Sequence, residues 1–235
     1  MFGLADAPQK DINATLHKVE GTPANDIDWR TSGVVQGVKD QGACGSCWAF
    51  STTGSTEAAW AIAGKGKLSL SEQQLVSCSG AYGNLGCSGG WYFWAWEYMK
   101  VNALETEASY PYTSGNGVTG ACKANASLGK VKVTGYTQVA ATSTAIKSAI
   151  NLKPVSVAIE ADTYVFQTYS TGIITSSACG TNIDHAVVAV GYGYNYYIVR
   201  NSWGTGWGES GYVRIGITEG NGTCGINQYV FYPTV

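Results

Sequence analysis

The sequence predicts an α+β protein in which a mainly helical half is followed by a mainly β half. Apolar segments of helical length are concentrated before residue 135, whereas segments rich in β-branched and aromatic residues follow it, with glycine turns between them. Runs of helices followed by runs of strands are typical of α+β architecture. A chain of 235 residues is long enough for two lobes with a sizeable core.

The expected helices come first in the chain. The longest begins at Cys47 and continues to about Ala63, where Gly64 and Gly66 end it. Three more are expected: a short one that a capping box at 69–72 opens towards Cys78, one over 91–101, and one that Thr142 or Ser143 caps ahead of Pro154. The third is mostly apolar, so most of it should be buried.

Strands dominate the second half. They are expected over Val155–Glu160, His185–Tyr192, Tyr196–Asn201 and Tyr212–Ile217. The predicted organisation is therefore a lead over 1–22, a mainly helical lobe over 23–135 and a mainly β lobe over 136–235.

Composition narrows the classes of function. Only 13% of the residues are charged and the formal net charge is −2, so no nucleic-acid partner is expected. No stretch approaches the roughly 18 apolar residues of a membrane span, so no membrane partner is expected. Residues 1–10 lack the roughly 7–15-residue apolar segment of a signal peptide, so none is expected within this chain.

Cysteine is present seven times, which is an odd number. In an oxidising compartment this count favours three disulfides and one thiol, but spacing alone leaves about 105 arrangements open.

The thiol with the clearest chemical role is Cys47. Ser46 is expected to cap the helix, which places Cys47 in its first turn, facing unpaired backbone N–H groups and the positive end of the helix dipole. A thiol in that position is favoured as a thiolate, and the thiolate is the nucleophile.

The surrounding residues carry a family resemblance. Cys44-Gly45-Ser46-Cys47-Trp48 fits the signature C-G-[SA]-C-[WY] of papain and the cathepsins. The chain therefore resembles the papain-like cysteine peptidases of the cathepsin L-like subgroup, over roughly 28–233. The resemblance implies their two-lobed fold, with a β-barrel-like second lobe and an active site in the cleft between the lobes.

The resemblance also implies the catalytic partners of Cys47. His185 follows it by 138 residues, inside the roughly 130–150 typical of the family, and the other histidine, His17, lies in the lead. Asn201 opens an Asn-Ser-Trp-Gly segment like the one in which the family asparagine orients the histidine. Gln41 matches the family glutamine that donates to the oxyanion together with the backbone N–H of Cys47.

A magnitude indicates how the thiol is activated. Lowering its pKa from about 8.5 to the 3–4 of papain corresponds to about 7 kcal/mol. A helix terminus contributes at most about 2 kcal/mol. Most of the shift must come from a neighbouring imidazolium, so the hypothesis is a Cys47⁻/His185⁺ ion pair.

Further implications of the resemblance are the disulfides and the substrate site. The family pattern pairs Cys44 with Cys87, Cys78 with Cys122 and Cys179 with Cys224, with no metal or cofactor. The implied substrate-binding residues are Gly89, Gly90, Trp91, Tyr92, Ala158, Ile183, Asp184, Ala186, Trp203 and Tyr229.

The pocket for the second residue before the scissile bond predicts the specificity. Its implied walls carry no charge, which favours Val or Leu over Arg, and bulky Tyr229 at its floor should disfavour Phe. No histidine occurs over 82–123, so the occluding loop of dipeptide-releasing members is absent and an endopeptidase is expected.

Three other interpretations stay open. Cys44 and Cys47 could serve a zinc or redox site, which predicts bound metal or a disulfide between them. The many aromatic residues would suit a non-catalytic homologue or a carbohydrate-binding module, which would not need Gln41, Cys47, His185 and Asn201 together. A transferase or ligase could use the same acyl-enzyme, and product analysis with an added amine would reveal it.

Residues 1–22 are interpreted as a propeptide remnant or an added leader, because Leu4-Ala5-Asp6 faintly resembles the end of a family propeptide. The expected partners are protein or peptide substrates, the protein's own propeptide and cystatin-like inhibitors. The expected state is a monomer in a lysosome-like or digestive-vacuole-like compartment, or a secreted one.

Overall fold

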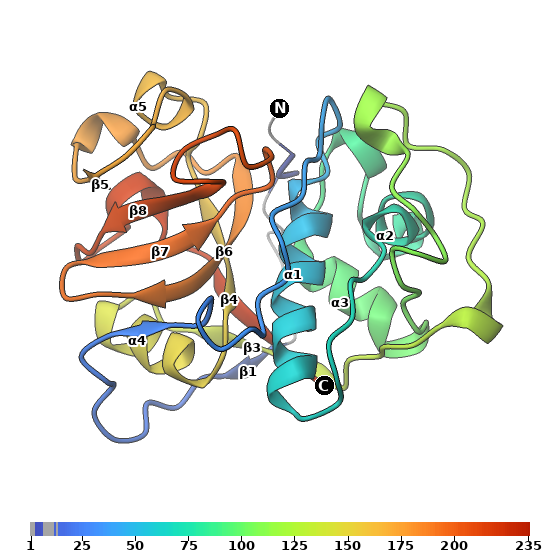
Figure 1. Cartoon of the computed structure of the whole chain (residues 1–235), viewed down its shortest axis with the longest axis horizontal. Helices are drawn as coiled ribbons and strands as arrows, with labels where there is room; N and C mark the ends of the chain where they lie inside the picture. The colour runs from blue at the N-terminus through green and yellow to red at the C-terminus, as the bar shows by residue number, and fades with distance from the viewer. Residues whose placement is uncertain (1–2, 7–11, 13) are drawn as a thin grey trace.

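The structure is a computed structural model that describes residues 3–6, 12 and 14–235. Figure 1 shows two halves, with α1, α2 and α3 on the right and a twisted sheet on the left. The helices are α1 (Cys47–Ile62), α2 (Glu72–Cys78), α3 (Tyr92–Val101), α4 (Ser143–Leu152) and α5 (Tyr164–Gln167). The short 3₁₀ helices are η1 (Gly80–Tyr82), η2 (Gly86–Ser88), η3 (Ser114–Asn116), η4 (Ala126–Leu128), η5 (Ser177–Cys179) and η6 (Thr223–Gly225).

The four helices expected after the lead are confirmed, as α1 to α4. The cap of α2 differs from the expected box, because Ser71 rather than Ser69 is the capping residue, and its hydroxyl accepts the N–H of Gln74 at 3.0 Å. Thr142 caps α4 in the same way, through the N–H of Ala145. None of the described helices is both long enough and apolar enough to cross a bilayer.

The strands form one mixed sheet. They are β1 (Thr15–Leu16), β2 (Ile27–Asp28), β3 (Gly135–Val139), β4 (Val155–Ile159), β5 (Ile173–Ile174), β6 (His185–Tyr192), β7 (Tyr196–Arg200), β8 (Tyr212–Gly216) and β9 (Val230–Thr234). Their order is β1-β3-β9-β4-β6-β7-β8-β5, and β2 pairs with β6. The four expected strands are confirmed as β4, β6, β7 and β8.

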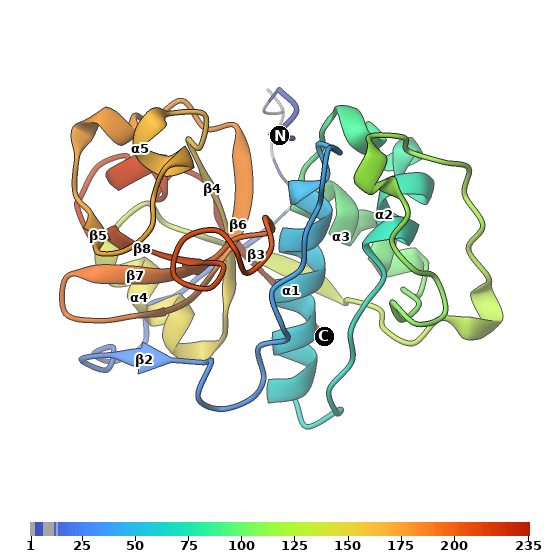
Figure 2. The ribbon, with the colours of Figure 1, turned by 45° about the horizontal axis from the view of Figure 1, so that its top comes forward.

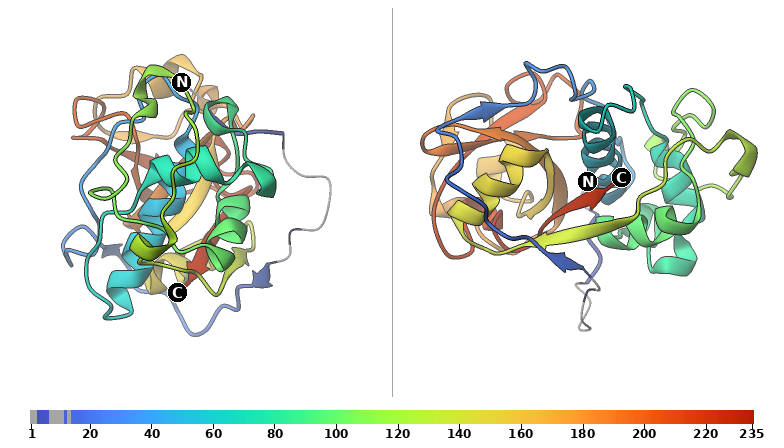
Figure 3. Two further views of the ribbon diagram at one scale, coloured as in Figure 1. Left: turned by 90° about the vertical axis from the view of Figure 1, so that its right-hand side faces the viewer. Right: turned by 90° about the horizontal axis from the view of Figure 1, so that it is seen from below.

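The expectation of a barrel-like second lobe is wrong in one respect, because the sheet does not close. Its outermost strands, β1 and β5, have two residues each, and in the described part of the chain each pairs with one neighbour only. Ladders this short leave the two edges apart, so the sheet is open and strongly curved rather than a closed barrel (Figure 3).

The two largest apolar cores lie in different parts of the molecule. One lies under the sheet and α4. The other fills the helical half, and it includes Ala158, Ala186 and Phe231 from β4, β6 and β9. The sheet therefore completes the helical core, and α1 packs against β6 as well as α3 (Figure 2). This packing fixes the beginning of α1 against the beginning of β6.

Disulfides brace each half separately. Cys44–Cys87 and Cys78–Cys122 lie in the helical half, and Cys179–Cys224 lies in the sheet half. These are the three pairs that the resemblance implied. All seven cysteines are described, so the remaining thiol is Cys47.

Part of the lead is described as well, and it touches the body near both of its ends and, through Ile12 and Ala14, between them. Residues 3–6 lie between the halves, near the N label of Figure 1. Farther along, β1 adds a parallel strand to β3, and His17 contacts Tyr232 and Ser148 through its two ring nitrogens at 3.0 and 3.1 Å. Residues 1–2, 7–11 and 13 lie outside the described part, so the interpretation of 1–22 as a propeptide remnant stays a prediction.

Candidate active site

The thiol of Cys47 lies at the first residue of α1 and is fully buried. The backbone N–H of Ala186, the second residue of β6, donates to its sulfur at 3.4 Å. The packing of α1 on β6 therefore places the thiol beside the residue that precedes Ala186, which is His185.

Ser46 does not cap α1 as the sequence predicted. Its φ and ψ are −105° and 15°, outside the extended region that a capping residue usually adopts, and its side chain makes no cap hydrogen bond. The hydroxyl instead contacts the Tyr112 hydroxyl at 2.8 Å. Tyr112 comes from the long segment between α3 and β3, which the sequence analysis did not connect with the site.

His185 is oriented by Asn201. Nε2 of the imidazole lies 2.8 Å from Oδ1 of Asn201, and both residues are buried. The two meet because β6 and β7 pair antiparallel, with Val188 opposite Arg200, so the start of β6 lies beside the end of β7. The Ser202 backbone N–H also donates to Oδ1 of Asn201, which fixes the amide.

Aromatic rings cover this pair. The ring of Trp203 lies 4.9 Å from that of His185, and Phe166 and Trp207 pack against Trp203 at 5.6 and 5.4 Å. This layer restricts solvent around the bond between His185 and Asn201, which strengthens it.

Gln41 reaches the site through strand-like pairing with the segment after β7. Its backbone N–H donates to the Ser202 carbonyl at 2.9 Å. The Ser202 hydroxyl donates to Oε1 of Gln41 at 2.7 Å, and Nε2 of Gln41 donates to the Cys44 carbonyl at 2.9 Å. These contacts decide which end of the amide carries the donors, and they place that end next to the start of α1.

Burial disfavours the charged forms of both Cys47 and His185. It raises the pKa of the Cys47 thiol to about 12, although the N–H groups of Ala186 and Trp48 act to lower it. Burial also lowers the pKa of His185 to about 4, against the opposing effect of Asn201. The hypothesis of a Cys47⁻/His185⁺ ion pair stays a prediction, and burial of both groups in this closed state opposes it.

Part of the lead lies beside Cys47, where a backbone hydrogen bond from Gly3 acts to lower the pKa of the thiol. The N–H groups of Gly3 and Leu4 donate to the Asp184 carbonyl, each at 3.1 Å. The Gly3 carbonyl accepts the N–H of Gly90 at 3.0 Å, and Leu4 forms a parallel bridge with Gly90. This extended segment uses the backbone groups that the sequence analysis assigned to substrate.

The side chain of Leu4 packs against the apolar cluster that contains the implied specificity pocket. The structure brings together in this cluster Trp91, Tyr92, Ala158, Ile183, Ala186 and Tyr229. Tyr229 is tied to the helical half, because its carbonyl accepts the Tyr92 hydroxyl at 2.6 Å and its ring lies 4.9 Å from Trp91. The indole Nε1 of Trp91 donates to the Ala5 carbonyl at 3.0 Å.

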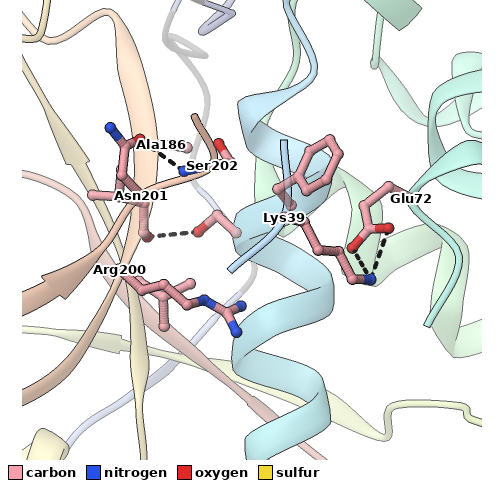
Figure 4. Close-up of a pocket in the computed structure, with 10 residues that line it drawn as sticks. Lys39, Glu72, Ala186, Arg200, Asn201 and Ser202 are labelled. Carbon is pink, nitrogen blue, oxygen red and sulfur yellow. Dashed lines mark hydrogen bonds and ion pairs between the residues drawn. The ribbon is translucent and has the colours of Figure 1, made fainter. Parts of the chain in front are cut away.

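A buried ionic cluster lies on the other side of a small cavity from Asn201 and Ser202 (Figure 4). Lys39 Nζ contacts the carboxylates of Glu72 at 2.7 Å and Glu57 at 3.5 Å. This cluster was not predicted from the sequence. The one signal for it was Glu72, a carboxylate in the first turn of an expected helix, where a cation could pair with it.

A comparison with family models matches residues 23–234 to the papain family of cysteine proteases. A cathepsin L-like proteinase of Fasciola hepatica is 48% identical over 89% of this chain and 65% of its own length. The thiol protease SEN102 of a Hemerocallis species is 45% identical over 96% of this chain and 64% of its own length. The chain thus spans slightly less than two thirds of these relatives.

Solved structures are similar over most of the chain. A cysteine protease of Carica candamarcensis in complex with E-64 has a TM-score of 0.82 at 41% identity, over 90% of this chain and 98% of that one. Bromelain protease from Ananas comosus, in complex with the E64 inhibitor, has a TM-score of 0.84 at 37% identity, over 90% of this chain and 99% of that one.

Proposed function

The chain belongs to the papain family of cysteine proteases, and from that premise we propose that it is a cysteine endopeptidase that cleaves peptide bonds through a thioester. One observation supports this above the others. The protein holds an extended segment of its own chain beside Cys47, through backbone hydrogen bonds to Asp184 and Gly90. A cleft that binds one peptide in this way is suited to bind another.

The proposed reaction has two steps, in which Cys47, His185, Asn201 and Gln41 act. The sulfur attacks the peptide carbonyl carbon, and the C–N bond breaks as His185 gives a proton to the leaving amine. Water then attacks the thioester, with His185 taking its proton, and the acid and the thiol are released. Asn201 engages Nε2 of His185, so Nδ1 is the nitrogen proposed to carry the transferred proton.

The oxyanion of each step is proposed to accept hydrogen bonds from Gln41 Nε2 and the Cys47 backbone N–H. Nε2 carries two hydrogens, and one of them goes to Cys44. The Ser202 hydroxyl on Oε1 prevents the amide from turning its oxygen towards the oxyanion.

Ionisation is proposed to follow opening of the cleft. When the lead leaves, water reaches Cys47 and His185, and the burial that now favours their neutral forms is relieved. The ion pair is thus proposed for the open enzyme only.

The lead is proposed to act as an inhibitor in the same chain. Gly3 lies nearest the thiol, and the chain then passes Gly90 and reaches the Trp91 indole at Ala5. A substrate would run the other way, since its residues before the scissile bond bind over Gly89 and Gly90 and lead towards Cys47. The reversed direction explains how the lead can fill the cleft without presenting a bond for cleavage.

The proposed specificity follows from the pocket where Leu4 lies. A side chain of that size fits among the uncharged walls, so substrates with Leu or Val two residues before the scissile bond should be cleaved faster than those with Arg. Tyr229, held by Tyr92, should disfavour Phe. Comparable kcat/KM values for Leu and Arg peptides would contradict this proposal.

The decisive experiment measures hydrolysis of a Leu-Arg fluorogenic peptide at mildly acidic pH under reducing conditions. The full chain is folded first, and the lead is then cleaved from the folded protein. Activity should rise on cleavage and be absent in Cys47→Ser. Activity that persists in Cys47→Ser would refute the proposed nucleophile, and an added amine would reveal acyl transfer by capturing the thioester.

The relatives suggest where the protein acts. Three of them are named digestive cysteine proteinases of Homarus americanus. A digestive or lysosome-like compartment, or secretion, is proposed on that basis and on the disulfides. Cystatin-like inhibitors are proposed as partners because they would use the same cleft, and a monomer is the proposed state.

A further inference from the structure

The hydroxyl of Tyr112 joins the two segments that carry the proposed oxyanion donors. It donates to the Gln41 backbone carbonyl at 2.8 Å. A phenol has a single hydrogen, so the 2.8 Å contact with Ser46 must be a donation from the Ser46 hydroxyl to the phenolic oxygen. One atom therefore connects the residue that supplies the side-chain donor with the residue that precedes Cys47.

Tyr112 is held firmly enough to fix that connection. Its backbone N–H donates to the Glu107 carboxylate at 2.8 Å. Its ring lies edge-on to Phe50 in α1, with the centroids 5.0 Å apart. Burial raises the pKa of Tyr112 to about 12, so the hydrogen that Gln41 accepts is retained at every pH at which a peptidase works.

We propose that Tyr112 is a positioning residue for the reaction, because its hydroxyl sets the spacing between the Gln41 amide and the Cys47 N–H. The proposal rests on the peptidase function proposed above. It also explains why Ser46 leaves α1 uncapped, since its hydroxyl is used on Tyr112. Two oxyanion donors act together only if their separation is fixed before charge develops.

The test compares Tyr112→Phe with wild type, each folded as the full chain and then freed of the lead. Phe keeps the ring on Phe50 and removes both hydroxyl contacts. We expect kcat/KM to fall about tenfold through kcat, less than the 10²–10³-fold cost of deleting a donor outright. A peptide aldehyde, whose thiohemiacetal oxygen resembles the oxyanion, should bind about tenfold more weakly.

Alkylation by iodoacetamide separates this role from a merely structural one. Displacement at its saturated carbon forms no oxyanion, so the alkylation rate of Cys47 and its pH profile should change less than twofold in Tyr112→Phe. Tyr110→Phe is the matched control, because its hydroxyl bonds only the nearby backbone of Lys123 and Ala121. That variant should retain wild-type kcat and aldehyde affinity.

Ser46→Ala provides a second route. It removes the Ser46 contact while leaving the donation from Tyr112 to Gln41, and no cap is lost. Ser46→Ala should lower kcat by a few-fold. The kcat of the double variant should be no lower than that of Tyr112→Phe alone, because both substitutions break the same linkage and their effects do not add. If Tyr112→Phe does not fold, Ser46→Ala alone tests the positioning role of Tyr112.

Two results would overturn the proposal. The first is a wild-type kcat and aldehyde affinity in Tyr112→Phe, or in Ser46→Ala where Tyr112→Phe does not fold. The second is an alkylation rate that falls as much as turnover, which would mean that the thiol or the fold was affected instead. A failed peptidase function is distinguishable, because wild type itself would then lack turnover, or Cys47→Ser would retain it.

Discussion

Replacing Lys39 with Met should destabilise the protein strongly and in a pH-dependent way. Lys39 Nζ is the cation that contacts Glu72 at 2.7 Å and Glu57 at 3.5 Å, and both carboxylates are about 1% exposed. Breaking a buried pair by removing one partner costs about 3–5 kcal/mol, because the other charge is left uncompensated. For a chain of this size, about 2–4 °C per kcal/mol corresponds to a fall of about 6–20 °C in the unfolding midpoint.

The pH dependence follows from Glu57. Burial raises its pKa and Lys39 opposes that effect, so the folded-state pKa should rise further in Lys39→Met. A carboxyl with a raised folded-state pKa weakens the fold above its unfolded value of about 4.3, and the cost disappears below it, where both states are protonated. The deficit of Lys39→Met should therefore be large at pH 7 and small near pH 4.

The assay is thermal unfolding at a fixed scan rate, with the full chain at pH 4 and pH 7. Lys100→Met is the matched control, because Lys100 pairs with Glu97 at 3.0 Å on the surface, where both side chains are about one third exposed. Such pairs contribute about 0–1 kcal/mol. An equal deficit at the two pH values, or one no larger than that of the control, would refute the reasoning.

Three further predictions concern the site and the surface. Asn201→Ala should lower kcat about tenfold or more, because His185 stays in place but is less well oriented. The loss should be well below the ~10⁴-fold that would follow if acid–base catalysis were lost entirely. An unchanged kcat would contradict this. Gly90→Ala should lower the unfolding midpoint and peptide affinity together, since its Cβ would lie 2.3 Å from a side-chain oxygen, and wild-type values for both would refute the clash. Arg214 lowers the pKa of Glu209 to about 2, so Glu209→Gln should be less stable than wild type above pH ~4.5, and the difference should shrink towards pH 2 and vanish below it; a difference in stability that stays constant across that range would exclude the linkage.

The parts of the site that depend on neighbouring residues in the chain could be predicted from the sequence. The start of a helix at Cys47 and the start of a strand at His185 depend on neighbouring residues, and both positions agree with the structure. The expected strand Tyr196–Asn201 ended one residue too late, because β7 ends at Arg200 and Asn201 follows it.

Long-range contacts were beyond that reasoning. The Ser46 hydroxyl contacts Tyr112, 66 residues away, so the local capping rule failed there. Strands β3 and β9 were not predicted, because the burial of each depends on pairing with the other across about 95 residues of chain. The surroundings of the Cys47 thiol also include a distant residue, since a backbone hydrogen bond from Gly3 acts on it.

If the lead inhibits as proposed, its contacts at 3–6 and 15–16 would determine how the protein becomes active. While 3–6 and 15–16 belong to one chain, the residues in the cleft act at an effective concentration in the millimolar range, so even weak contacts keep the cleft filled. A single cut between them leaves β1 on the sheet but turns the cleft-filling piece into an independent short peptide. On the proposed inhibition, that piece should dissociate by dilution at micromolar protein, so one cleavage would suffice for an irreversible switch without unfolding either half.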